Sequence, residues 1–358
     1  MPAVTTIVRT DRTDRTDRTG SGAGWLREQA DSNSQGRKPR MLPRPVNQSM
    51  SLMLGALPQK KLIAGCFANL SESSPVSVQH YENFPVASLL CPPALRPAVT
   101  AIYHFARTAD DLADEGSATA EVRLADLAQY RCDLQATARL TAPSPRWQPQ
   151  FAALAAQLQR HALPLPLLHA LLDAFEQDVR NPDYADRDAL LRYCSCSANP
   201  VGRLLLHLHG IDDRLSLQQS DAICSALQLI NFWQDLSVDA PRGRHYVPLA
   251  DLQALRVSAA ELAAATDSLR ARDLVRGLCD WAEALMLQGA PLATRMPGRS
   301  GWELRLVVQG GLRILEKIRH MDHAVLLQRP RLTALDGPLL LWRAARMTGM
   351  RTSGSLQR

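Results

Sequence analysis

Residues 103–116 read YHFARTADDLADEG, an apolar helical run that ends in a dense group of carboxylates. The acidic side chains are Asp110, Asp111, Asp114 and Glu115. Like charges this close together repel one another, and the C-terminal end of a helix, where the macrodipole is negative, is an unfavourable place for them. The segment therefore requires a cation or a basic partner.

Residues 227–248 read LQLINFWQDLSVDAPRGRHYVP and repeat the same design, with an apolar helix that ends in spaced aspartates. At about 3.6 residues per turn, the polar positions of each segment fall on one helix face. These positions are Tyr103, Arg107, Asp110, Asp111 and Asp114 in the first segment, and Gln228, Asn231, Asp235 and Asp239 in the second. Two such helix ends facing each other would place at least five carboxylates around one cleft.

The composition indicates an all-α protein. The chain has 358 residues, of which 46% are hydrophobic and 5% aromatic. Alanine and leucine are abundant, runs of β-branched residues are scarce, and alternating apolar and polar segments are hard to find. Proline and glycine separate helical stretches of roughly 15–25 residues, which is typical of a helical bundle. The length allows a large core in one big domain or two smaller ones, and we expect a single domain.

The two ends of the chain differ from its body. We expect residues 1–75 to be a disordered extension, because the repeat RTDRTDRTDRTG and the Gly, Ser and Pro-rich sequence after it have little to bury. Initiation at Met50 or Met53 is an alternative that would leave most of this extension untranslated. The helical domain is predicted over residues 76–327, and residues 328–358 are predicted to form a basic amphipathic tail.

The net charge of +6 belongs to these two ends. Residues 1–49 hold nine Lys and Arg against five Asp and Glu, residues 328–358 hold six against one, and residues 50–327 hold 26 against 29. This distribution argues against a nucleic-acid groove and favours contact of the tail with an anionic membrane surface. The seven cysteines are scattered without metal-site spacing, as expected for reduced thiols in the cytoplasm. No apolar stretch reaches the roughly 18–20 residues that span a bilayer.

Magnesium is the cation that suits the two acidic segments best. Mg²⁺ prefers hard oxygen ligands and shares its shell with water and substrate phosphate, so the predicted ligand is a magnesium-bound diphosphate. An EF-hand starting at Asp235 fails, because Ala240 stands where glycine is needed and Tyr246 where a bidentate glutamate is needed. A ferritin-like di-metal bundle would require Glu-x-x-His pairs, and the chain has none.

The chain resembles the squalene/phytoene synthases, a family of head-to-head prenyl synthases, from about Tyr81 to Arg329. Its motifs are most similar to those of the hopanoid-pathway squalene synthase branch of this family. The segments that carry the resemblance are HYENFPVASLLCP, YHFARTADDLADEG, YCSCSANPVGRLLL, LINFWQDLSVD, RGRHYVP and MLQGAPLATRMPGRSGWELRLVVQGGLRILEKI. One departure is Val238, where the broader family often has glutamate.

The resemblance implies a helical bundle of the isoprenoid-synthase type around a central apolar cavity. It also implies that the aspartates of both segments hold two or three Mg²⁺ ions on a prenyl diphosphate. The residues implied for the metal are Asp110, Asp111, Asp114, Asp235 and Asp239. Those implied for the substrate are Arg107, Arg203, Asn231, Arg244 and Tyr246 around the diphosphate, with Phe84 and Tyr103 facing the carbocation. A surface salt bridge is the alternative for Arg107 and Arg203.

The branch resemblance implies ionisation of presqualene diphosphate and capture of the cation by water, which gives hydroxysqualene without a nicotinamide. The alternatives are condensation of two farnesyl diphosphates to presqualene diphosphate or squalene, phytoene synthesis, and a non-catalytic helical partner subunit. The expected location is the cytoplasm, with peripheral contact at the inner face of the cytoplasmic membrane. Sibling enzymes of the same pathway are the expected protein partners.

Overall fold

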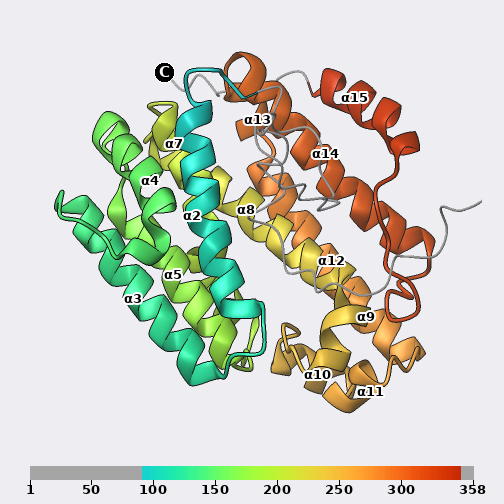
Figure 1. Cartoon of the computed structure of the whole chain (residues 1–358). Helices are drawn as coiled ribbons and strands as arrows, with labels where there is room; N and C mark the ends of the chain where they lie inside the picture. Colours follow the sequence, from blue (N-terminus) through green and yellow to red (C-terminus); the bar gives the residue numbers. More distant parts are fainter. Residues whose placement is uncertain (1–90, 348–358) are drawn as a thin grey trace, which may run out of the picture. The chain divides into compact units, whose positions relative to one another are not determined.

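The computed structural model describes residues 91–347, which form α-helices joined by short loops (Figure 1). No strand occurs within this range, so the expected all-α fold is confirmed. The predicted start of order near Val76 and the predicted site residue Phe84 lie outside the described residues. The helices are α2 (Arg96–Asp114), α3 (Ala120–Ala138), α4 (Gln148–His161), α5 (Leu165–Arg180), α6 (Arg187–Ser197), α7 (Asn199–Leu208), α8 (Arg214–Gln234), α9 (Leu236–Asp239), α10 (Leu249–Leu255), α11 (Ala259–Ala263), α12 (Leu269–Gly289), α13 (Leu292–Arg295), α14 (Gly298–His320) and α15 (Gly337–Arg346).

Local sequence signals fix where several of these helices begin. The Asp186 carboxylate accepts a hydrogen bond of 2.7 Å from the Ala189 backbone N–H at the start of α6. Asp213 caps α8 in the same way, through a 2.9 Å bond from the N–H of Ser216. Such caps satisfy backbone donors that the first helical turn leaves unpaired.

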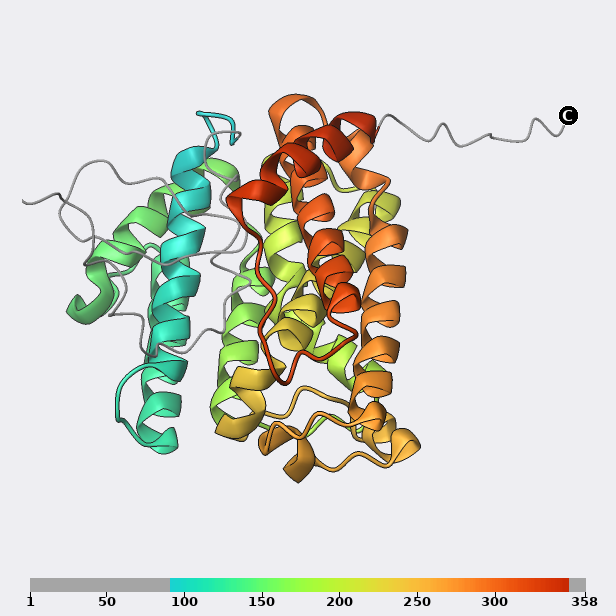
Figure 2. The same cartoon turned by 90° about the vertical axis from the view of Figure 1, so that its right-hand side faces the viewer.

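Two hydrophobic clusters hold the helices together. One joins α2, α3, α4 and α5, where the rings of Phe105 and Tyr130 stack with centroids 5.3 Å apart. The other is built around α8, α12 and α14, with Trp233 completely buried. Figure 2 shows the blue and green helices of the first cluster on one side and the orange helices α12 and α14 on the other. The long helix α8 contacts α7 and α14 and packs along α12.

The C-terminal helix α15 is fastened to α14 by ion pairs. Asp336 accepts from Arg313 at 2.8 Å and from Lys317 at 2.7 Å, and Glu316 pairs with Arg343 at 2.5 Å. Within the predicted amphipathic tail, residues Gly337–Arg346 are thus helical and packed against α14. The boundaries of the N-terminal extension and the tail stay predictions.

The contact between α8 and α12 depends on Gly289, because there is no room for a side chain there. A Cβ atom at this position would lie 2.6 Å from the Gln219 carbonyl oxygen and 2.9 Å from the Ile223 amide nitrogen. Backbone atoms cannot move aside as a flexible side chain can. We expect Gly289→Ala to lower the free energy of unfolding by about 1–3 kcal/mol in urea denaturation.

Gly277 on the same helix is the matched control, because its nearest neighbour to an added Cβ is the Arg187 guanidinium at 3.9 Å. Gly277→Ala should be neutral or stabilising by up to about 1 kcal/mol, since alanine is the better helix former. Equal effects of the two substitutions would contradict the close approach of α8 and α12.

Candidate active site

The two acidic segments lie at the C-terminal ends of α2 and α8. Asp114 is the last residue of α2, whereas α8 ends at Gln234 and the chain continues through Asp235 into the single turn α9. The break does not disturb the helical spacing of the second segment. The Asp235 N–H donates to the Asn231 carbonyl at 2.9 Å, and the Asp239 N–H donates to the Asp235 carbonyl at 2.9 Å.

Arg244 joins the two helix ends. Its guanidinium pairs with the Asp114 carboxylate of α2, which is 130 residues away in the chain. The same guanidinium lies 3.6 Å from Asp239, measured from Nη1 to Oδ1. One side chain thus reaches a carboxylate from each acidic segment, so the two helix ends converge.

Arg107 compensates the charge of the first segment. It lies on α2 one turn before the aspartates, and its Nη1 is 3.1 Å from Asp110 Oδ2. The same guanidinium also pairs with Asp111 and, at 2.6 Å, with Glu115. Arg107 lies on the same helix face as these carboxylates and therefore offsets the like-charge repulsion expected from the sequence.

Asp235 is a buried charge of the second segment. Its residue surface is only 6% exposed, and it pairs with Arg329, whose Nη2 lies 3.1 Å from Asp235 Oδ2. Burial raises the pKa of Asp235, and Arg329 opposes this effect. The segment that carries Arg329 is held beside α8 by a 2.7 Å hydrogen bond from the Gln234 side chain to the Pro330 carbonyl.

Tyr246 belongs to a buried aromatic group next to the aspartates. Its ring stacks on Phe232 with centroids 3.8 Å apart and planes 4° from parallel. Asp178 of α5 accepts hydrogen bonds from Tyr193 at 2.8 Å and from Tyr246 at 3.3 Å. Burial raises the pKa of both phenols well above the usual value, so both stay neutral and act as donors. Sequence reasoning identified Tyr246 but missed Asp178, Tyr193 and Arg329.

The remaining predicted residues lie at different distances from these helix ends. Asn231 is one turn before Asp235 on α8, and Tyr103 is one turn before Arg107 on α2; both are half-buried. Arg203 is exposed and pairs with Asp221 at 2.6 Å. Asp221 precedes Asp235 by fourteen residues of α8, which is about 21 Å along the helix axis. The surface salt bridge is therefore the better description of Arg203.

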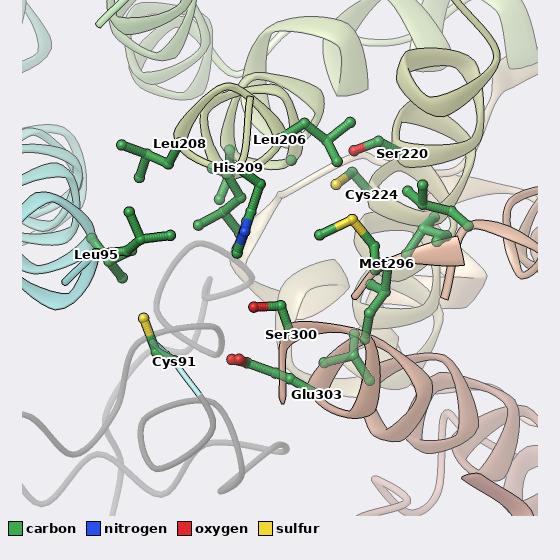
Figure 3. A pocket seen from close by; sticks show the side chains of 18 of the residues that line it. Cys91, Leu95, Leu206, Leu208, His209, Ser220, Cys224, Met296, Ser300 and Glu303 are labelled. Atoms are coloured by element: carbon green, nitrogen blue, oxygen red, sulfur yellow. The ribbon is translucent and has the colours of Figure 1, made fainter. Parts of the chain in front are cut away.

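An apolar cavity of about 130 Å³ lies beside the same two helices (Figure 3). Its walls come from α7, α8, α13, α14 and the start of α2, and most of the lining side chains are apolar. Leu227 lines the cavity eight residues before Asp235, or about 12 Å along α8. Val99 lines it eleven residues before Asp110, or about 16 Å along α2. The helices therefore lead from a hydrocarbon-lined space to the carboxylates.

The chemistry of the donor set suits a hard divalent cation. All five predicted ligands are carboxylates, and Arg244 shows that carboxylates from both segments come within reach of one cationic group. Within residues 91–347 no group of three or more His, Cys, Asp or Glu side chains is arranged so that it could hold a metal ion. Arg107, Arg244 and Arg329 pair with the aspartates, so Mg²⁺ would share or displace these guanidinium groups.

Comparisons with known proteins agree with this arrangement. The family described as squalene/phytoene synthase matches residues 77–336. The chain is 38% identical to the hydroxysqualene synthase of Zymomonas mobilis over 54% of this chain and 64% of that protein. It is 32% identical to the hydroxysqualene synthase of Rhodopseudomonas palustris over 67% of this chain and 80% of that protein.

Among solved structures, the chain is similar to squalene synthase HpnC from Alicyclobacillus acidocaldarius. The TM-score is 0.63 at 36% identity, and the match covers 68% of this chain and 90% of that one.

The ion pair of Asp235 with Arg329 gives a stability prediction. Arg329→Leu leaves a buried carboxylate without its cation, and we expect the free energy of unfolding at pH 7 to fall by about 3 kcal/mol. The folded-state pKa of Asp235 is already raised by burial. The loss should therefore be present above that pKa and diminish as the pH falls through it, because protonation removes the buried charge.

Urea denaturation at several pH values measures this effect. Adding Asp235→Asn to the Arg329→Leu variant should restore part of the lost stability. Arg203→Leu, which breaks an exposed pair, should cost less than about 1 kcal/mol. Equal losses for Arg329→Leu and Arg203→Leu would show that Asp235 is not enclosed.

Proposed function

Because the chain belongs to the squalene/phytoene synthase family, we propose that it ionises presqualene diphosphate and captures the cation with water. The products are hydroxysqualene and pyrophosphate. The family establishes a prenyl diphosphate enzyme with an all-α fold. The observation that carries the proposal is the position of Arg244 between Asp114 and Asp239, at the ends of two helices that also line an apolar cavity.

In this proposal the aspartates of both segments hold the metal. Asp110, Asp111 and Asp114 on one side, and Asp235 and Asp239 on the other, would bind two or three Mg²⁺ ions, which neutralise charge on the departing pyrophosphate. Arg107, Arg244 and Arg329 already lie at these carboxylates. Their planar guanidinium groups suit diphosphate oxygens.

The neighbouring polar residues would orient the diphosphate. Asn231 shares a helix face with Asp235, and the neutral Tyr246 phenol is fixed by stacking on Phe232. The Tyr246 O–H, which donates to Asp178 at 3.3 Å, would turn to a diphosphate oxygen as negative charge develops there on breaking of the C–O bond. Arg203 has no place in this set, because it pairs with Asp221 on the surface.

The apolar cavity would hold hydrocarbon and exclude water from the cation until capture. Burial of apolar surface favours a prenyl chain there by about 25 cal/mol per Å². Tyr103 and Phe84 are proposed to face the cation, whose charge an aromatic ring stabilises.

Water capture is favoured because relatives at 32–38% identity are named hydroxysqualene synthases. In the overall reaction the C–O bond to pyrophosphate breaks, a C–O bond to water forms, and one proton leaves. No hydride is transferred, so we propose that no nicotinamide takes part. The rival first step, condensation of two farnesyl diphosphates, needs the same metal site, and so would phytoene synthesis.

We further propose that α15 contacts an anionic membrane surface, because the substrate and product are lipids. Leu335 is 91%, Leu341 57% and Trp342 53% exposed. Arg346 lies 4.3 Å from the Trp342 ring centroid, so basic and apolar groups occur on one surface. No helix within residues 91–347 has the length and apolarity to cross a bilayer. The contact would be peripheral, at the inner face of the cytoplasmic membrane and near sibling enzymes.

The double variant Asp110→Asn with Asp114→Asn tests the metal site. Purified protein is incubated with Mg²⁺ and presqualene diphosphate, farnesyl diphosphate or geranylgeranyl diphosphate, without NADPH, and products are identified by mass spectrometry. We expect hydroxysqualene from presqualene diphosphate alone. The variant should lose turnover by about a thousandfold or more and retain its helix content.

The matched control replaces two exposed carboxylates of α12, Asp273→Asn with Asp280→Asn, and should retain turnover. Activity in the Asp110→Asn/Asp114→Asn protein would refute the metal site. Turnover of farnesyl diphosphate by the unaltered chain would favour the condensation reaction, and absence of turnover with every diphosphate would favour a non-catalytic subunit.

The membrane proposal predicts that Leu341→Ser with Trp342→Ser weakens binding to vesicles. We expect about a tenfold loss of affinity for phosphatidylglycerol vesicles, because two large apolar side chains no longer insert. Co-sedimentation measures the affinity, with phosphatidylcholine vesicles as the uncharged comparison. Leu269→Ser is the control, because Leu269 is 79% exposed but belongs to α12. Equal binding by all three proteins would exclude α15 as the docking element.

A further inference from the structure

Glu303 is an isolated carboxylate in the wall of the apolar cavity. It lies on α14, and Figure 3 shows its carboxylate and the Ser300 hydroxyl directed into the cavity. Its side chain has no hydrogen bond or ion pair to any other residue between 91 and 347. Desolvation raises the pKa of Glu303 to about 8. The group is thus a polar feature in a wall that is otherwise suited to hydrocarbon.

Glu303 lies at the end of the cavity that is farther from the aspartates. Gly311 of α14 faces Leu227 and Ile230 of α8, because a Cβ atom at Gly311 would lie 3.1 Å and 3.3 Å from their side chains. Glu303 precedes Gly311 by eight residues, or about 12 Å.

Ile230 precedes Asp235 by five residues, or about 8 Å. Glu303 shares the cavity with Ser220 and Ile223, which come before Ile230 on α8. The distance from Glu303 to Gly311 and the distance from Ile230 to Asp235 therefore run in the same direction and add. Glu303 is therefore about 20 Å from the level of Asp235.

This separation corresponds to a diphosphate bearing a fifteen-carbon arm. Each isoprene unit adds four carbons to the chain, or about 5 Å when extended at about 1.5 Å per bond. Three units extend about 15 Å, and the diphosphate with its cation accounts for the remaining few ångströms. A fourth unit would reach the carboxylate and the neighbouring groups of Ser300 and His209.

We propose that Glu303 sets the length of the prenyl arm by closing the far end of the cavity to a fourth isoprene unit. The proposal rests on the proposed function as a prenyl diphosphate enzyme and specifies its substrate class, which is a diphosphate with fifteen-carbon arms. Hydrocarbon pressed against a carboxylate removes its remaining water without supplying a hydrogen bond, so the longer arm binds poorly. A fifteen-carbon arm ends before this contact.

The test measures selectivity between presqualene diphosphate and its forty-carbon homologue, prephytoene diphosphate. Pyrophosphate release gives kcat/KM for each substrate. In Glu303→Leu the forty-to-thirty-carbon ratio of kcat/KM should rise by about tenfold or more, because an apolar side chain tolerates the longer arm. In Glu303→Gln the rise should be smaller, because the amide, like the carboxyl group, is polar.

Two further variants separate the effect of polarity from the effect of cavity volume. Val307→Ala removes apolar volume from the same helix one turn closer to the aspartates, and Glu283→Ala removes a partly exposed carboxylate of α12 that does not line the cavity. Neither should change the ratio. A ratio in Glu303→Leu within about twofold of the unaltered protein, or an equal rise in Val307→Ala, would overturn the proposal.

A failure of the proposed reaction would look different. If the unaltered chain does not convert presqualene diphosphate, the same ratio is measured with farnesyl and geranylgeranyl diphosphates, and the expected change in Glu303→Leu is the same. That result would refute the proposed reaction, and the proposal about arm length would still be tested with the other two substrates. A chain inactive with every diphosphate would overturn both.

Stability provides a readout independent of turnover. The ordinary glutamate pKa is 4.5, and that of Glu303 is about 8 in the folded protein. The folded state therefore binds the extra proton between these values, and stability falls as the pH rises through this window. Glu303→Gln removes this dependence.

We expect the melting temperature of Glu303→Gln minus that of the unaltered protein to increase as the pH is raised from 5 to 9. The titratable groups facing Glu303 are Cys91 before α2, His209 after α7 and Cys224 on α8, and the lining residues near α13 are apolar. Both proteins contain these groups, so their titration contributes equally to the two melting temperatures and cancels in the difference. A constant difference across this range would mean a hydrated carboxylate and would overturn the proposal.

Discussion

The rest of the site depends on the positive charge between Asp114 and Asp239. Two unit charges of one sign about 4 Å apart repel by about 4 kcal/mol at an effective dielectric constant of 20, so two acidic helix ends stay together only with a cation between them. Arg244 supplies it in the structure, and Mg²⁺ would add to it when a diphosphate binds. Because the guanidinium is held by carboxylates from both segments, the site is already assembled around a charge of the required sign.

The same helices that converge at their charged ends separate the two tasks of the site. α2 and α8 place carboxylates at one end and line the apolar cavity at the other. Ionisation requires strong neutralisation of the leaving group, whereas a carbocation requires surroundings with little water. The distance along the helices satisfies both requirements, because a prenyl diphosphate is itself charged at one end and apolar along its length.

Periodicity in the sequence predicted the helical class and the one-sided spacing of Asp235 and Asp239, since both are properties of neighbouring residues. Arg329 was missed because it pairs with an aspartate 94 residues away, and in the sequence it looks like one more basic residue of the tail. Asp178 and Glu303 are single carboxylates on long helices, and only tertiary packing shows what surrounds them. Arg203 was selected because a guanidinium suits phosphate, but no sequence pattern reveals that Asp221 is its partner.

Two polar ends limit the apolar length that this bundle offers. In the proposed function the aspartates bind the diphosphate through the metal, and Glu303 lies about 20 Å away at the other end, so the prenyl arm has to fit between two polar sites. Apolar walls alone discriminate poorly, because an additional methylene group gains burial wherever space exists. A desolvated carboxyl group reverses that gain at one defined depth, since contact with hydrocarbon leaves its polar atoms without a hydrogen-bond partner. In this proposal selection by length follows from where a polar group is placed, and it requires no tighter packing of the hydrocarbon itself.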